Sequence, residues 1–203
     1  MTPRTVEEVM KIGIDISQIV YQGTGVASYT KNLVENLLKI DRENEYILFF
    51  ASLRRKIQNS KFKIQNYNAK FKIKTFKIPP TLLDLLWNRL HIFPIEWFIG
   101  MVDVFFSSDW TQPPTIKAKK VTTIHDLSIF KFPQEHHPKI VATQKRRLKW
   151  VRKECDLVIC DSLATKRDVV KILGIEEERL RVVYPGVKAG ITNFIRSYKK
   201  TYT

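Results

Sequence analysis

The stretch that decides the fold is Asp156-Leu-Val-Ile-Cys-Asp-Ser162, an apolar run that ends in two polar residues. Runs of this length that are apolar throughout are typical of strands covered on both faces. A short basic helix is expected next, with Ser162 as its N-cap and its end before Gly174, since glycine readily adopts the left-handed conformation of helix C-termini. Another apolar run follows at residues 180–184, so this part of the chain reads as strand, helix, strand.

The same alternation extends back through the chain and predicts an α/β fold, a Rossmann-like parallel sheet flanked by helices. The expected strands are residues 12–16, 46–50, 71–78, 102–106, 121–124, 157–160 and 180–184. The first helix has an apolar stripe at spacings of three and four that we expect to pack on the sheet, formed by Val26, Tyr29, Leu33, Leu37 and Ile40. Residues 61–64 are expected to form a loop or hairpin, and residues 70–74 a strand with one wet face.

Length and composition suit a single cytoplasmic domain. A chain of 203 residues can bury a core without disulfides, and Cys155 and Cys160 are expected to be packed thiols. The first residues contain no apolar signal-peptide core, which favours a cytoplasmic location. Residues 82–101 are apolar, but four charged or His residues interrupt them and Pro94 breaks the helix, so we do not expect a membrane span.

The formal net charge of +15 predicts attraction to polyanions. Residues 54–77 contain nine Lys or Arg and residues 138–153 contain seven, with no acid in either segment. Nucleic acid, an anionic membrane surface and a phosphorylated substrate would each fit such a surface. A solvated basic face without a ligand explains it equally well.

Ligands of an open parallel sheet bind beyond the carboxyl ends of the strands, and the first candidate there is the loop at residues 17–25. Gly23 and Gly25 allow close approach of a ligand, with Thr24 between them, and amides at the start of the next helix attract anions. A purely conformational role is the alternative. A nicotinamide cofactor is disfavoured, because Ser28 replaces the third glycine and no acid ends the second strand.

The second candidate is His125-Asp126, directly after the strand at residues 121–124. His125 could position a sugar hydroxyl or a phosphate, and Asp126 could orient a loop amide. The alternative is a histidine satisfied by the backbone, with Asp126 as a turn or cap residue.

The third candidate is Asp109-Trp110, after the strand at residues 102–106. The acid could accept sugar hydroxyls, and the indole could cover an apolar ring face. Ser162 could also touch a ligand, although capping is its simpler role. We expect no metal and no cofactor, since His136-His137 has no matching ligand cluster and no Asp-x-Asp is present. A serine-hydrolase elbow is also lacking.

Four motifs together resemble the N-terminal domain of group 4 glycosyltransferases, the retaining enzymes of the GT-B fold. They are residues 156–162, Arg181-Val-Val-Tyr-Pro-Gly-Val187, Val121-Thr-Thr-Ile-His-Asp-Leu127 and Gly23-Thr-Gly-Val-Ala-Ser-Tyr29. The resemblance covers residues 11–187, leaving residues 188–203 as a disordered tail or the start of a second domain. It implies half of a GT-B fold, a glycine loop that lines the interdomain cleft, and substrate contact by His125.

The resemblance also implies the reaction, which is transfer of a sugar from a nucleotide-sugar to a glycan or lipid-linked acceptor in polysaccharide biosynthesis. In that family the donor diphosphate and the Glu-x7-Glu motif belong to the second domain, which residues after Val187 do not supply. We therefore expect the hexosyltransferase-class activity to be missing from this chain alone.

Two further interpretations concern the basic surface. The helix expected at residues 138–153 combines Ile140, Leu148, Trp150 and Val151 with Lys145, Arg146, Lys149 and Arg152, so it could attach to the inner face of an anionic membrane. The competing class is a non-catalytic Rossmann-like module that binds anionic lipid or nucleic acid. Nucleic acid is the weaker partner, because no RNA- or DNA-binding motif accompanies the charge.

Overall fold

The computed structural model describes residues 9–55, 57 and 67–186. Its strands are β1 (Lys11–Asp15), β2 (Glu45–Ala51), β3 (Lys70–Phe76), β4 (Val104–Ser107), β5 (Lys119–Ile124), β6 (Leu157–Cys160) and β7 (Leu180–Val182). The longest helices are α1 (Gly25–Ile40) and α5 (Pro138–Glu154). The shorter helical segments are η1 (Ser17–Val20), α2 (Pro80–Leu83), η2 (Asp84–Arg89), α3 (Glu96–Ile99), α4 (Ser128–Lys131), η3 (Pro133–Glu135), α6 (Leu163–Asp168), η4 (Val169–Leu173) and η5 (Glu177–Arg179).

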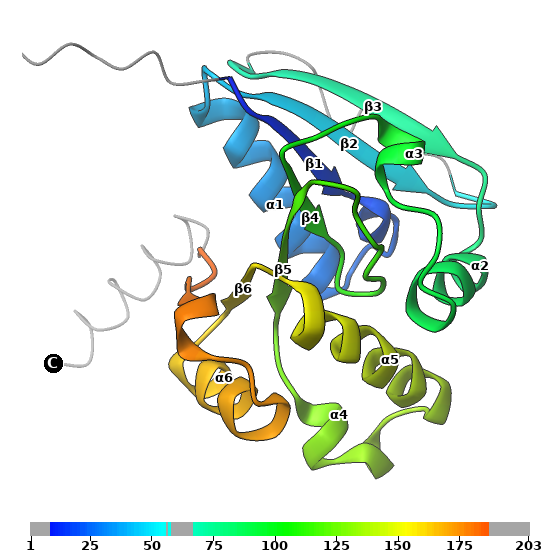
Figure 1. Ribbon diagram of the computed structural model, residues 1–203, viewed down its shortest axis with the longest axis vertical. Coiled ribbons are helices and arrows are strands. Elements are labelled where there is room, and N and C mark those ends of the chain that lie inside the picture. Colours follow the sequence, from blue (N-terminus) through cyan, green and yellow to red (C-terminus); the bar gives the residue numbers. More distant parts are fainter. Residues whose placement is uncertain (1–8, 56, 58–66, 187–203) are drawn as a thin grey trace, which may run out of the picture.

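The strands form one parallel sheet with the order β3-β2-β1-β4-β5-β6-β7 (Figure 1). All six neighbouring pairs are parallel. The chain runs outward from β1 through β2 to β3, then returns to the other side of β1 and continues through β4 to β7. This is a doubly wound sheet, and the direction of winding reverses between β1 and β4.

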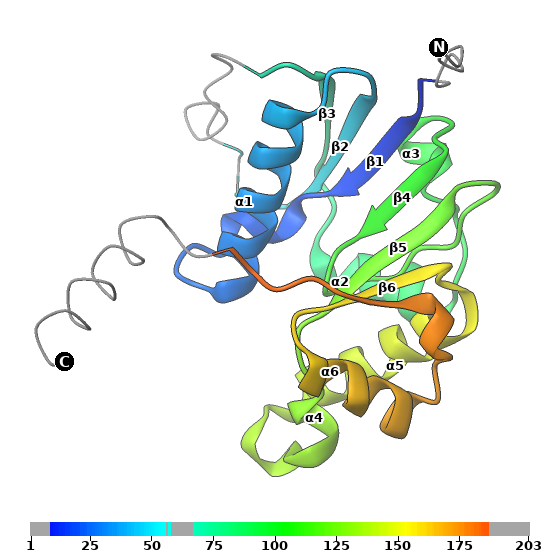
Figure 2. The same cartoon turned by 90° about the vertical axis from the view of Figure 1, so that its left-hand side faces the viewer.

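Helices cover both faces of the sheet, and the alternation along β2 shows which face each helix covers. Leu48 and Phe50 pack in one cluster with Val34 and Leu38 of α1. Phe49, which points the other way, packs with Trp87, Ile99 and Phe105 in a second cluster. Figure 2 shows α1 on one side of this part of the sheet. A third cluster joins β5, β6 and β7 to α5 and to the helix that follows β6.

The sequence-based fold class is confirmed, because each of the seven expected strands is present, with ends that differ by up to two residues. Ser162 caps α6, since its Oγ accepts a hydrogen bond from the backbone N of Thr165 at 3.0 Å. The helix continues through η4 and ends at Gly174, whose φ is 62°. Cys155 and Cys160 are free and buried, as expected for packed thiols.

The prediction for α1 was wrong in its detail. The residues of α1 that are buried against the sheet are Ala27, Val34 and Leu38, one position later than the predicted stripe. The sequence contains apolar pairs at Val26-Ala27, Leu33-Val34 and Leu37-Leu38, so two neighbouring stripes have the same helical period. Packing on the sheet selects the second stripe, and the first stripe lies at the margin of the helix, where Ile40 remains 74% exposed.

The apolar segment at residues 82–101 forms two helical pieces rather than one. The first ends at Leu90, and His91 and Phe93 then have positive φ values of 54° and 60°. Pro94 follows and its carbonyl accepts from Trp97 in the first turn of α3. In the described part of the chain, no helix is long and apolar enough to cross a membrane.

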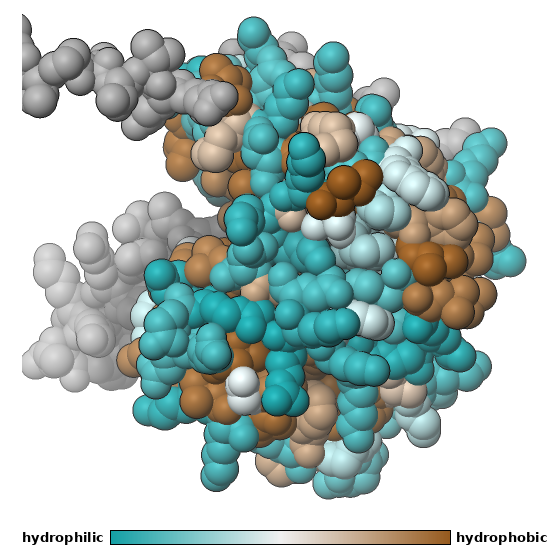
Figure 3. All heavy atoms as spheres, in the orientation of Figure 1, coloured by the Kyte–Doolittle hydropathy of each residue, from teal (hydrophilic) through white to brown (hydrophobic). Residues whose placement is uncertain are grey.

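The surface shows one predicted feature, the wet face of β3. On the edge strand β3 the exposed positions include Lys70, Lys72 and Lys74, which is the wet face predicted for residues 70–74 and discourages pairing with another strand. Figure 3 shows that the face seen in Figure 1 is largely hydrophilic, with a hydrophobic patch near α2. The segment at 61–64 and the tail at 188–203 lie outside the described residues.

Candidate functional site

The candidate site lies where the winding of the sheet reverses. At that edge β1 ends at Asp15, β4 ends at Ser107 and β5 ends at Ile124, so the loops that follow them are neighbours. Asp15 is 2% exposed, and burial raises the pKa of its carboxyl, although hydrogen bonds from Ser17 and Ser108 oppose this rise. Its Oδ1 accepts from the backbone N of Ser17 at 2.8 Å, which holds the start of the first loop.

The glycine loop connects η1 to α1. Gly23 has a φ of 85°, a conformation that other residues rarely adopt. Thr24 is the N-cap of α1: its Oγ1 accepts from the backbone N of Ala27 at 3.2 Å and donates to the carbonyl of Tyr21 at 2.8 Å. Gly25 is the first residue of the helix, and nothing lies within 4 Å of the place where its Cβ would be. The loop thus leaves open space at the start of α1, as close approach of a ligand would require.

His125 lies directly after β5, and its ring is held from two sides. Its Nδ1 is 2.6 Å from Oδ2 of Asp161, the residue that follows β6. The edge of its ring contacts Tyr29 of α1, with ring centroids 4.8 Å apart and planes at 84°. Tyr29 is itself fixed, because its hydroxyl lies 3.0 Å from Oγ1 of Thr123. In the residues that the structure describes, Nε2 of His125 makes no hydrogen bond, so it remains available to a ligand.

Asp161 is a site residue that sequence reasoning did not select. It stands in the stretch that decides the fold, but only Ser162 was chosen there. The signal was its position, because β6 pairs with β5 in parallel and the two strands therefore end at the same edge. Its effect reaches its neighbours: burial raises the pKa of Tyr29 and raises that of Cys160 to about 11, and the charge of Asp161 adds to both shifts.

Asp126 is exposed and acts as a turn residue. Its Oδ1 accepts from the backbone N of Ser128 at 2.8 Å, which orders the start of α4. Partial burial alone would raise the pKa of its carboxyl, but the hydrogen bonds from Ser128 and the nearby His125 and His136 lower it overall. The geometry therefore matches both the expected orienting of a loop amide and the turn role.

Asp109 and Trp110 follow β4 and are held mainly through their backbone. The carbonyl of Asp109 accepts from Nε2 of Gln144 at 2.7 Å, and that of Trp110 accepts from Nδ2 of Asn88 at 3.0 Å. The buried Oδ1 of Asp109 has no hydrogen-bond partner in the described part of the chain. Their loop follows β4 at the same edge as His125, and among the described residues no hydrogen bond joins either residue to His125.

Arg147 of α5 fastens these loops to each other and was also not selected from the sequence. It is 2% exposed and donates to the carbonyl of Ser108 at 3.2 Å, to Oγ1 of Thr122 at 2.7 Å and to the carbonyl of Thr123 at 3.2 Å. Burial lowers the pKa of its guanidinium, and the negative charge of Asp109 opposes this change. One side chain thereby connects the end of β4 with the end of β5.

The hydroxyl of Ser162 is occupied by the helix it caps. It accepts from the backbone N of Thr165 and lies 3.0 Å from Oγ1 of the same residue. Thr165 in turn donates to the carbonyl of His125 at 3.0 Å. Ser162 therefore supports the backbone at His125 through Thr165, and ligand contact by Ser162 itself stays a prediction.

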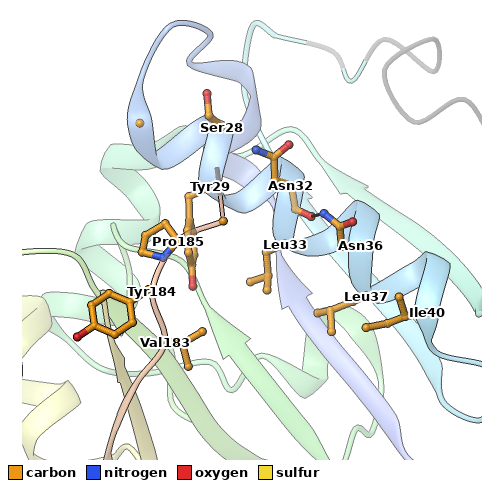
Figure 4. Close-up of a pocket in the computed structure, with 12 residues that line it drawn as sticks. Ser28, Tyr29, Asn32, Leu33, Asn36, Leu37, Ile40, Val183, Tyr184 and Pro185 are labelled. Carbon is orange, nitrogen blue, oxygen red and sulfur yellow. Dashed lines mark hydrogen bonds between the residues drawn. The ribbon is translucent and has the colours of Figure 1, made fainter. Parts of the chain in front are cut away.

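An open groove of about 610 Å³ runs beside the site along α1 (Figure 4). Tyr29, which contacts His125, lines one end of it, and the other lining residues are Gly25, Ser28, Asn32, Leu33, Asn36, Leu37, Ile40 and residues 183–186. The outer stripe of α1, predicted to pack on the sheet, thus forms one wall of this groove.

Metal binding was not expected. Among the described residues, no group of three or more His, Cys, Asp or Glu side chains is arranged to hold a metal ion. The side chain of His137 instead accepts from the backbone N of Lys139 at the start of α5.

A comparison with curated proteins found no significant match. A family model described as Glycosyltransferase Family 4 matches residues 23–190, which include Gly23, Gly25, His125 and Asp161. The parallel sheet flanked by helices is consistent with one half of a GT-B fold. By this match over most of its length, the chain belongs to Glycosyltransferase Family 4.

Proposed function

We propose that this chain is the acceptor-side domain of a retaining hexosyltransferase that moves a sugar from a nucleotide-sugar to a hydroxyl of a glycan or lipid-linked acceptor. Membership of the family supports the reaction class. The observation that carries the assignment to this edge is the His125–Asp161 pair, which the ring of Tyr29 connects to the first turns of α1.

The pair gives His125 a defined chemical role. With Asp161 accepting at Nδ1, neutral His125 carries its proton there and presents the lone pair of Nε2 outward. That lone pair can accept a hydrogen bond from a sugar hydroxyl, while the ring of Tyr29 holds the imidazole in place. His125 then orients the substrate, and Asp161 is a positioning residue that acts through it.

The remaining contacts belong to the same proposal. Gly23, Thr24 and Gly25 line the side of the cleft that faces the donor, and Asp109 and Trp110 take part in holding sugar. The nucleotide-sugar is a co-substrate, and no metal or other cofactor is required. We place the reaction in polysaccharide biosynthesis on the cytoplasmic side of a membrane.

Binding to a glycan array tests the proposal without requiring turnover. The wild-type chain is expected to retain a subset of glycans, and His125→Ala is expected to lose them by about tenfold or more in affinity, as for one charge-assisted or buried hydrogen bond. The matched control is His137→Ala, an exposed histidine whose ring, in the described part of the chain, only accepts a hydrogen bond from the backbone N of Lys139. Equal binding by wild type and His125→Ala would contradict the assigned site.

A second assay addresses catalysis by the isolated chain. When the pure protein is incubated with UDP-, GDP- and ADP-sugars and the array glycans, we expect no release of nucleotide. The reason is that in the family the donor diphosphate is bound by the second domain. Turnover by this chain alone would show that it is a complete enzyme.

A further inference from the structure

A second hollow lies at the same edge of the sheet, beyond the ends of β2 and β3. Its volume is about 430 Å³, and its lining residues are Ser52, Leu53, Arg54, Arg55, Ile57, Ile73, Thr75 and Lys77. Three of these eight side chains are cationic and none is acidic. The hollow is distinct from the groove along α1, with which it shares no lining residue.

Within the described residues, no ion pair neutralises the cations around this hollow. Arg54 and Lys77 form no ion pair in the described part of the chain, although nine such pairs are present elsewhere in it. The whole segment 54–77 contains no acid. Like charges gathered around a concave surface repel one another, and a bound anion would relieve that repulsion.

Arg55 is already held in place beside the hollow. Its guanidinium donates to the carbonyl of Val20 and lies 5.1 Å from the centre of the Tyr21 ring. Its backbone N donates to Oγ of Ser52 at 3.0 Å, which closes the turn after β2. These contacts connect the hollow to the segment that leads into the glycine loop, so less side-chain freedom is lost when an anion binds.

The chemistry of the lining matches a phosphate that carries a larger group. Guanidinium and ammonium groups are the usual partners of phosphate oxygens, and the hydroxyls of Ser52 and Thr75 can add hydrogen bonds. Leu53, Ile57 and Ile73 supply apolar surface next to the cations. A hollow of this volume is in the range of small-molecule sites and exceeds what a bare phosphate fills.

We infer that this hollow binds the phosphate or diphosphate of a phosphorylated ligand through Arg54, Arg55 and Lys77. The inference deepens the proposed function. It rests on that function only where it identifies the phosphorylated ligand as the acceptor of the sugar. The acceptor would then carry its phosphate in this hollow and its hydroxyl toward His125. A lipid-linked phosphate and a soluble sugar phosphate share this chemistry.

The test measures binding of pyrophosphate by isothermal titration calorimetry at 150 mM salt, on the order of physiological ionic strength. The wild-type chain is expected to bind, and the double variant Arg54→Gln/Lys77→Gln is expected to bind about tenfold or more weakly. The matched control is Lys70→Gln/Lys72→Gln, which removes two exposed lysines of β3 that do not line the hollow. We expect the affinity of this control variant to stay within about twofold of wild type, because salt screens the attraction between pyrophosphate and lysines outside the hollow.

Sedimentation with vesicles distinguishes the two sources of phosphate. Phosphatidic acid vesicles are compared with phosphatidylcholine vesicles, and pelleting that depends on Arg54 and Lys77 identifies a lipid phosphate. Pyrophosphate binding without such pelleting identifies a soluble one. Absence of binding in both assays, or equal losses in the two double variants, would overturn the inference in favour of general charge attraction.

The outcome is separable from that of the proposed function. Neither binding assay needs sugar transfer or His125, so the hollow can fail while glycan binding at His125 is retained. The substituted side chains are exposed, so thermal unfolding of the double variants is expected to match that of wild type and excludes misfolding as the cause of lost binding.

Discussion

His125 owes its orientation to residues that are far away in the sequence. Asp161 and Tyr29 reach it from the end of β6 and from the first turns of α1, and the hydroxyl of Tyr29 lies 3.0 Å from Oγ1 of Thr123 in β5. A histidine held at Nδ1 by a carboxylate has one tautomer selected for it, and this is what gives the exposed nitrogen a defined role.

The first prediction concerns this tautomer. In Asp161→Asn the amide can offer either its oxygen or its nitrogen to Nδ1, so the preference for a proton on Nδ1 is expected to fall. The measurement is ¹⁵N NMR of histidine-labelled protein, in which the two ring nitrogens report the tautomer directly. Asp168→Asn is the matched control, because Asp168 pairs with Lys131 and not with a histidine. An unchanged His125 spectrum in Asp161→Asn would show that the pair does not set the tautomer.

At the scale of elements, two glycines have different roles: Gly13 lies against the core, and Gly25 borders open space that a ligand could enter. A Cβ on Gly13 of β1 would lie 2.7 Å from Cδ1 of Ile99 and 2.9 Å from Cδ2 of Phe105, whereas one on Gly25 would meet nothing within 4 Å. Gly13→Ala is therefore expected to lower the free energy of unfolding by about 1–3 kcal/mol, as overpacking does. Gly25→Ala is expected to leave it within about 1 kcal/mol of wild type.

Urea denaturation and glycan binding separate these two effects. Gly25→Ala is expected to weaken glycan binding while the protein stays stable, because its methyl group occupies the space that a ligand would enter. If binding by Gly25→Ala equals that of wild type, the glycine loop has only a conformational role.

The hydrogen bonds that Asp41 accepts in the turn between α1 and β2 should make the stability of the fold depend on pH. Asp41 accepts from the backbone N of Glu43 and of Asn44 at 2.9 and 3.1 Å, and from the Tyr46 hydroxyl at 2.6 Å. Burial would raise its pKa, but these hydrogen bonds lower it below the ordinary value of 3.8. The stabilisation is therefore fully present above pH 3.8 and is lost as the pH falls through the lower folded-state pKa.

Asp41→Asn is expected to cost about 1 kcal/mol at pH 7, since a neutral amide replaces the charged acceptor. The difference from wild type should shrink as the pH falls below about 4, where Asp41 of the unfolded chain becomes protonated. Thermal unfolding of both proteins at pH 7, 4 and 3 measures this difference. A constant difference across that range would contradict the assigned cause.

At the scale of the molecule, Arg147 joins α5 to the ends of the neighbouring strands β4 and β5. Arg147→Met keeps the apolar stem and removes the guanidinium, which leaves three buried acceptors without their donor. We expect the free energy of unfolding to fall by about 3 kcal/mol. Arg152→Met, an exposed arginine of the same helix, is expected to change it by less than about 0.5 kcal/mol. Similar losses in the two variants, measured by urea denaturation, would contradict this role.

The burial of residues in α5 limits which of its side chains could contact a membrane. Leu148 and Val151 are in the core, and Trp150 stacks on His91 with centroids 3.6 Å apart, so these residues are not available for insertion. Attachment through α5 therefore remains a proposal that depends on the charges of exposed residues such as Lys145, Lys149 and Lys153. Sedimentation with anionic vesicles is expected to succeed at low salt and to fall away as salt rises. Binding that persists at high salt would contradict a purely electrostatic attachment.

The sequence by itself determined the strands, their parallel arrangement and the family, because each of these follows from local periodicity and short motifs. It also placed His125, the glycine loop and Asp109 at one edge of the sheet, since parallel strands end together. Only the tertiary structure decided that Asp161 and Tyr29 hold His125, that Arg147 joins the loops, and which of two apolar stripes of α1 faces the sheet. The reason is physical: contacts between residues more than twenty positions apart depend on register, helix rotation and side-chain direction, none of which leaves a period in the chain.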